Sequence, residues 1–174
     1  MIPLYSFQIS ELYAPSLLDQ IPLLFRILIF SDGSLTRHLQ IILGDYINIE
    51  LENTALAQLN DYHGNLLYTK IDYPQISRQI WLVTEKNGKV VYANSIWNEN
   101  ILRKYFKDPN IPIGNWLIES ELDIFRKIYK VEYVHYYDLE KHFGYKGPFW
   151  SRYYFLIHKG DILASINEIF SSRI

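Results

Sequence analysis

The hydrophobic positions in the first part of the chain predict two helices joined by a short turn. Residues 16–30 are largely apolar and are expected to be helical, with a break at Pro22. An Asp-Gly-Ser turn follows, in which Ser34 is suited to cap the second helix. Apolar residues then recur at helical spacing, namely Leu35, Leu39 and Ile42. Gly44 is a typical end for this helix, because glycine readily adopts the left-handed backbone that closes a helix.

From about residue 45 the apolar period changes to two, which predicts β-strands. Alternating or β-branched stretches recur at 47–51, 77–84, 89–94, 124–137, 151–158 and 161–170. A short helix is expected at 98–106. Strands that follow helices in this way indicate an α+β fold, with helices packed on an antiparallel sheet, and we expect a single domain over residues 1–174.

Two dipeptides predict tight hairpin turns. Asn87-Gly88 is the stronger signal, because both residues tolerate the positive φ of a type I′ turn. A two-residue loop there would pair Leu82 with Ala93. Lys159-Gly160 is expected to turn the last two strands, which would bring Arg152 close to Glu168 within one residue of register.

Two charged residues interrupt the apolar faces of their strands. Glu168 shares its face with four apolar residues, namely Ile162, Ala164, Ile166 and Phe170. Arg78 shares its face with Ile80 and Leu82 in the same way. An isolated buried charge is costly, so each residue needs either a partner or a ligand. The alternative is that each lies at a sheet edge and reaches solvent, as most charged residues do.

The proximity of Arg152 to Glu168 has two interpretations. The two side chains can form a structural ion pair, which is the commoner arrangement. Alternatively, Arg152 and its neighbours can line an anion pocket that holds a carboxylate. The residues alone leave both interpretations open.

The composition excludes several classes of function. With 49% hydrophobic and 21% charged residues the chain is typical of a folded globular protein. The formal charge of −2 and the lack of clustered Lys and Arg argue against nucleic-acid binding. There is no cysteine, and the five histidines show no metal-binding spacing, so no metal is expected. Asp138 and Glu140 lie near His142 and could bind a metal, but the preferred interpretation is a solvated turn. The longest apolar run, Ile21–Phe30, contains Arg26 and is too short for stable membrane insertion, and no targeting leader is expected at the N-terminus.

Several segments in order along the chain resemble the chorismate lyase family, in the branch found in cyanobacteria and red-algal chloroplast genomes. The first is an apolar stretch that leads into a DGS(L/M)TR-like turn at 23–37. Residues 77–82 and 92–95 resemble the family's R-x-(I/V)-x-L strand and its partner strand. Residues 111–117 resemble its P-(L/I)-G-x-x-L loop, 150–153 its Arg-containing strand, and 167–170 its final (T/N)-E-x-F strand. Together they span roughly residues 22–170.

The resemblance implies a reaction and a set of site residues. The reaction would convert chorismate to 4-hydroxybenzoate and pyruvate, for quinone synthesis, without a cofactor. Arg78 matches the residue that grips the ring carboxylate, and Leu35 and Ile113 match positions whose backbone lies at that pocket. Glu168 matches the carboxylate that meets the ring oxygen. Arg152 matches a strand arginine near the pocket. The second carboxylate of chorismate needs its own cation, and our hypothesis is that Arg152 serves it.

The resemblance also implies partners and a location. The expected partners are the substrate and the product, the expected oligomeric state is a monomer, and the expected location is a plastid or, in a cyanobacterium, the cytoplasm. The same fold also serves as a small-molecule sensor in transcription regulators. The alternative function is therefore a non-catalytic protein that binds an aromatic acid.

Overall fold

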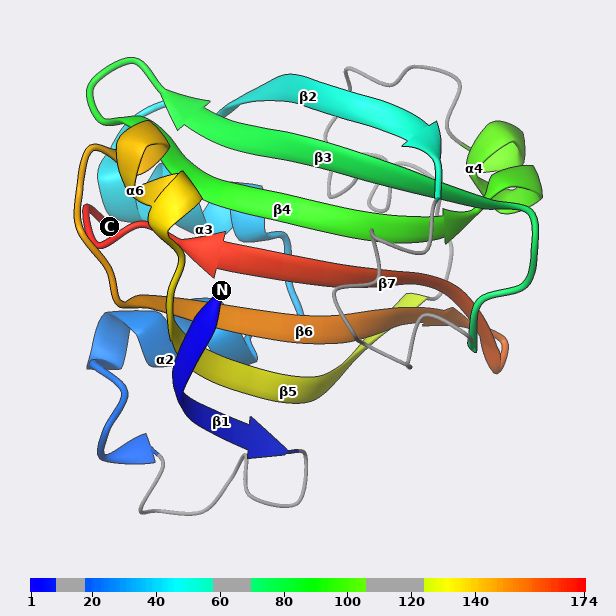
Figure 1. The fold of residues 1–174 in the computed structure, drawn as a ribbon, viewed down its shortest axis with the longest axis horizontal. Coiled ribbons are helices and arrows are strands. Elements are labelled where there is room, and N and C mark those ends of the chain that lie inside the picture. The colour runs from blue at the N-terminus through cyan, green and yellow to red at the C-terminus, as the bar shows by residue number, and fades with distance from the viewer. Residues whose placement is uncertain (9–17, 58–69, 106–123) are drawn as a thin grey trace.

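A seven-stranded antiparallel sheet forms the centre of the computed structural model (Figure 1), which describes residues 1–8, 18–57, 70–105 and 124–174. The spatial order of the strands is β1-β5-β6-β7-β4-β3-β2. The strands are β1 (Ile2–Gln8), β2 (Asn48–Leu56), β3 (Gln75–Thr84), β4 (Gly88–Asn98), β5 (Ile124–His135), β6 (Phe149–His158) and β7 (Asp161–Phe170). Every neighbouring pair is antiparallel, so the predicted α+β class is confirmed.

The two predicted N-terminal helices are present and cover one face of the sheet, behind it in Figure 1. The helix α2 (Leu23–Phe30) begins directly after Pro22, and α3 (Leu35–Leu43) follows it. The Ser34 hydroxyl accepts a hydrogen bond from the Arg37 amide at 3.3 Å, as the capping prediction requires. Gly44 ends α3 with φ +59°, in the left-handed region.

The opposite face carries α6 (Tyr137–Phe143), in front of the sheet in Figure 1. This helix corrects the interpretation of 138–142 as a turn. Leu139 and Phe143 are four residues apart, and both are buried against an aromatic group on the sheet that includes Trp81 and Tyr92. A short helix, α4 (Glu99–Tyr105), lies where 98–106 is predicted to be helical. None of the described helices is long and apolar enough to span a bilayer.

The β3–β4 hairpin differs from the predicted register. The loop has three residues, 85–87, because the Asn87 amide donates to the Thr84 hydroxyl oxygen at 2.9 Å. Gly88 then takes a positive φ of +66°, as expected after a three-residue turn. The register shifts by one further residue between Val83 and Leu82, so Leu82 pairs with Val91, and the predicted pairing with Ala93 is wrong.

The β6–β7 hairpin agrees with prediction. His158 pairs with Asp161, and the turn residues Lys159 and Gly160 both have positive φ, +50° and +91°. This register places Arg152 directly opposite Glu168. The edge strand β1 has no counterpart in the prediction, because all but one of its residues are exposed and no apolar alternation marks it.

Candidate functional site

A cavity lies between the sheet and the start of α3, on the face that α2 and α3 cover. Its volume is about 60 Å³. The lining residues come from α3 and from every strand except β1, namely Leu35, Thr36, Ile49, Arg78, Ile80, Leu82, Ala93, Ser95, Arg126, Tyr154, Leu156, Ile166 and Glu168. Most of this wall is apolar, and the charged groups on it are therefore partly removed from water.

Strand parity predicts that Arg78 and Glu168 each share a face with apolar residues of their own strand. In the structure both line the cavity, together with Ile80 and Ile166 from those faces. Arg78 pairs across β3–β4 with Ser95, and Ser95 pairs across β4–β7 with Ile166, two residues before Glu168. Only β4 separates the strands that carry the two charged residues, so those strands lie roughly 10 Å apart. The register of three strands therefore places a guanidinium and a carboxylate along one apolar wall.

Arg78 is buried, with 4% of its surface exposed. Burial lowers the pKa of its guanidinium, because the charged form loses contact with water. An arginine nevertheless stays protonated at neutral pH, so the cavity contains a fixed positive charge. Its strand is braced by Ser95, whose hydroxyl donates to the Arg78 carbonyl at 3.2 Å and accepts from the Trp97 indole at 2.9 Å.

Glu168 is 6% exposed and has a donor on each carboxylate oxygen. The Nε of Arg152 donates to Oε2 at 2.6 Å, and the Tyr154 hydroxyl donates to Oε1 at 2.8 Å. Hydrogen bonds from a charged donor are about twice as strong as neutral ones. Glu168 is thus held in place from two sides on the cavity wall.

The Tyr154 hydroxyl is a protonated donor across the physiological pH range. Burial raises the pKa of its phenol, and the neighbouring Glu168 carboxylate raises it further, since both disfavour a phenolate. Tyr154 also lines the cavity, so its ring and hydroxyl form part of the surface beside Glu168.

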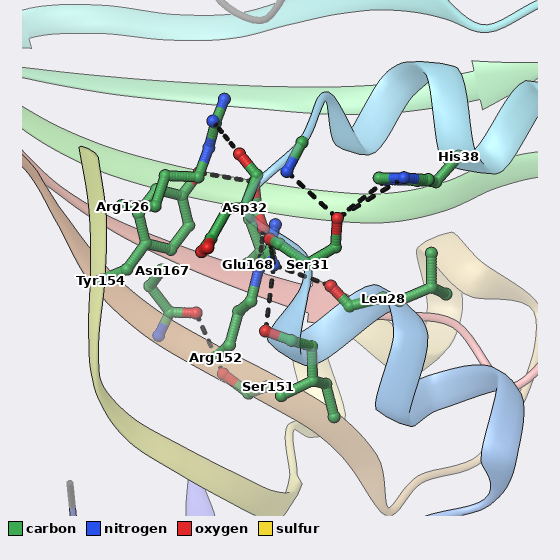
Figure 2. Close-up of polar contacts among 12 residues, drawn as sticks. Leu28, Ser31, Asp32, His38, Arg126, Ser151, Arg152, Tyr154, Asn167 and Glu168 are labelled. Atoms are coloured by element: carbon green, nitrogen blue, oxygen red, sulfur yellow. Dashed lines mark hydrogen bonds and ion pairs between the residues drawn. The ribbon is translucent and has the colours of Figure 1, made fainter. Parts of the chain in front are cut away.

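Arg152 does not line the cavity, and its guanidinium lies between Glu168 and the end of α2 (Figure 2). Its Nη1 donates to the carbonyls of Leu28, Ile29 and Ser31, at 2.7, 3.0 and 3.2 Å. Carbonyls in the last turn of a helix lack intrahelical donors, so Arg152 caps α2. Burial alone lowers the pKa of Arg152, but the attraction of Glu168 outweighs this effect and the pKa is raised. These contacts favour the structural ion pair over an anion-binding role.

The N-terminus of α3 faces the cavity through Leu35 and Thr36. Amides in the first turn of a helix have no intrahelical acceptor, and the helix dipole makes this end partly positive. Leu35 therefore lines the cavity at the partly positive end of α3. Ile113 lies outside the described residues.

Arg126 on β5 is a lining residue that the sequence analysis missed. Its Nη1 donates to the Asp32 carbonyl at 2.5 Å, just before α3 (Figure 2). The available signal was strand parity, because Arg126 alternates with Ile124 and Ile128 in a predicted strand. Within the described ranges, no group of three His, Cys, Asp or Glu residues is arranged to hold a metal ion.

The fold and the cavity define a class of small α+β domains that have a cavity with charged side chains on one sheet face. The effector domain of PhnF from Mycobacterium smegmatis has the same fold, with a TM-score of 0.57 at 10% identity over 81% of this chain and 90% of that domain. A longer PhnF structure gives a TM-score of 0.59 at 11% identity and covers 83% of this chain and 66% of that one.

The family follows from the sequence comparison. The pattern of the Rv2949c-like chorismate pyruvate-lyases matches residues 29–174, and the chain belongs to this family. Curated relatives include proteins named ycf21 from Porphyra purpurea, 35% identical over 87% of this chain and 82% of the relative, and from Cyanophora paradoxa, 33% identical over 84% and 76%.

Proposed function

We propose that this protein is a cofactor-independent lyase that converts chorismate to 4-hydroxybenzoate and pyruvate. The observation that carries the proposal is the placement of Arg78 and Glu168 on one apolar cavity wall, separated by a single strand. The family to which the chain belongs includes enzymes of this activity. The product would feed quinone synthesis, and we propose a plastid location, or the cytoplasm of a cyanobacterium, because the ycf21 relatives come from algae.

The carboxylate on the ring of chorismate is assigned to Arg78. A planar guanidinium binds a carboxylate through two parallel hydrogen bonds, and burial strengthens such charge-assisted bonds. The first two residues of α3, Leu35 and Thr36, line the same cavity, and the helix dipole favours an anion at this end of α3. Ile113 keeps the role that the family resemblance implies, a backbone contact at the same carboxylate.

The oxygen-bearing side of the ring is assigned to Glu168. In the reaction the ether bond breaks and its electron pair stays on the departing oxygen, while the neighbouring ring carbon loses a proton. The enolpyruvate that leaves gains a proton and becomes pyruvate, and the ring becomes aromatic. In this proposal Glu168 orients the ring hydroxyl and relays a proton. The alternative is that positioning and desolvation alone accelerate the elimination.

Arg152 is assigned a positioning role. It fixes Glu168 on one side and the end of α2 on the other, so the catalytic carboxylate and the connection that leads into α3 are held by one side chain. A cavity of about 60 Å³ is small beside the roughly 300 Å³ and more of typical ligand pockets. In this proposal the cavity widens when chorismate binds.

The direct test is to incubate the purified protein with chorismate and to follow 4-hydroxybenzoate and pyruvate by chromatography. We expect the two products in equal amounts. Arg78→Lys, which keeps the charge but loses the planar fork, should retain the fold and lose most of the activity. Folded wild-type protein that binds 4-hydroxybenzoate but forms neither product would refute the lyase and favour the second function, an aromatic-acid binding protein. The likeness to the PhnF effector domain supports that second function at the level of the fold.

A further inference from the structure

We propose that Arg126 binds the second carboxylate of the substrate, the one on the enolpyruvyl group, and so makes the site selective for a dicarboxylate. This inference rests on the proposed function. It assigns the role that the sequence suggested for Arg152 to a different residue, because the Nε and Nη1 of Arg152 already bind Glu168 and the carbonyls at the end of α2.

The position of Arg126 is the first argument. It pairs with Leu156 across β5–β6, and both residues line the cavity. Counting from β5 to β3 in the sheet order gives four strand spacings, so the backbones of Arg126 and Arg78 lie roughly 19 Å apart across the cavity floor. Both residues line the same cavity, so their long side chains approach it from opposite sides. An elongated ligand with an anion at each end requires two cations arranged in this way.

The available hydrogen-bonding capacity of Arg126 is the second argument. One N–H donates to the Asp32 carbonyl, which orients the guanidinium toward the loop before α3. A guanidinium has five N–H donors. Within the described residues, no carboxylate is paired with Arg126, whereas the charge of Arg152 is matched by Glu168.

The chemistry of the step is the third argument. When the ether bond breaks, the electron pair moves onto the enolpyruvyl oxygen, and negative charge grows on the fragment that already carries a carboxylate. A cation on this side of the cavity stabilises the departing fragment more than the bound ground state. After pyruvate leaves, 4-hydroxybenzoate has only the carboxylate that Arg78 binds. Arg126 should therefore matter for the substrate and little for the product.

The test compares Arg126→Gln with Lys127→Gln. Lys127 is the next residue on the same strand, is exposed, and points to the other face, so its variant removes the same charge at nearly the same place without touching the cavity. Two constants are measured for each variant, the KM for chorismate and the inhibition constant of 4-hydroxybenzoate. We expect Arg126→Gln to raise the KM at least about tenfold and to change the inhibition constant less than about twofold, while Lys127→Gln matches the wild type. Arg126→Lys should recover part of the loss.

Two results would overturn the inference. One is a KM for Arg126→Gln equal to that of Lys127→Gln. The other is an equal weakening of substrate and product, because loss of the Asp32 contact alone would disturb both ligands alike. If wild-type protein forms no product, the lyase proposal fails separately. Calorimetric titration then decides the role of Arg126: selective loss of chorismate binding supports it, and an equal effect on both ligands, or no chorismate binding by the wild type, overturns it.

Discussion

Replacing Arg152 with methionine should destabilise the protein strongly, because the change leaves a buried carboxylate without its cation. Arg152 is 1% exposed, and its ion pair with Glu168 is 2.6 Å long. Removing one partner of such a pair typically costs about 3–5 kcal/mol. The carbonyls of Leu28 and Ile29 also lose their donor, which adds to the cost. Small domains have only about 5–15 kcal/mol of stability, so the variant should be close to unfolding at physiological temperature.

Urea unfolding followed by circular dichroism measures this loss. The matched control is Arg103→Met, which breaks an exposed pair with Glu99 on α4 and should cost less than about 1 kcal/mol. The double variant Arg152→Met with Glu168→Met should be more stable than Arg152→Met alone, because it removes both charges together. The reasoning is wrong if Arg152→Met loses less than about 1 kcal/mol, or if the second substitution makes it less stable.

Three further predictions concern the site and its supports. Glu168→Gln should lower turnover about a hundredfold with unchanged substrate affinity if the carboxylate relays a proton, and turnover near that of the wild type would leave only positioning. Because the pKa of Tyr154 is raised in the fold, the unfolded chain loses this proton first as the pH rises past the ordinary value of 10. The free energy of unfolding should therefore fall above pH 10, by up to about 1.4 kcal/mol per pH unit from this residue. In urea titrations at several pH values, Tyr154→Phe should show a shallower fall. Equal slopes of unfolding free energy against pH for the two proteins would contradict this prediction. Ser34→Ala should cost about 1 kcal/mol, measured by thermal unfolding, whereas a neutral result would show that its cap on the Arg37 amide contributes little.

Local sequence signals predicted the elements that depend on local physics. The cap at Ser34, the left-handed Gly44 and the Lys159-Gly160 turn all follow from backbone preferences of a few residues. The first hairpin was placed correctly but with the wrong register, because the Thr84 side chain competes for the Asn87 amide and selects a longer loop. The helix α6 was missed because it has only two turns, and its burial comes from the far face of the sheet.

Strand parity in the sequence determined that Arg78 and Glu168 each interrupt the apolar face of their own strand. The cross-strand register, which brings both residues to one side of the sheet, came only from the tertiary structure. Strand parity cannot say which arginine lies at the cavity, because it assigns Arg78, Arg126 and Arg152 alike to the apolar faces of their strands. Only the tertiary structure decided among them, since the end of α2 places its unpaired carbonyls over Arg152 and leaves the other two at the cavity. The positions of those acceptors depend on how a helix docks on distant strands, and no local pattern encodes that.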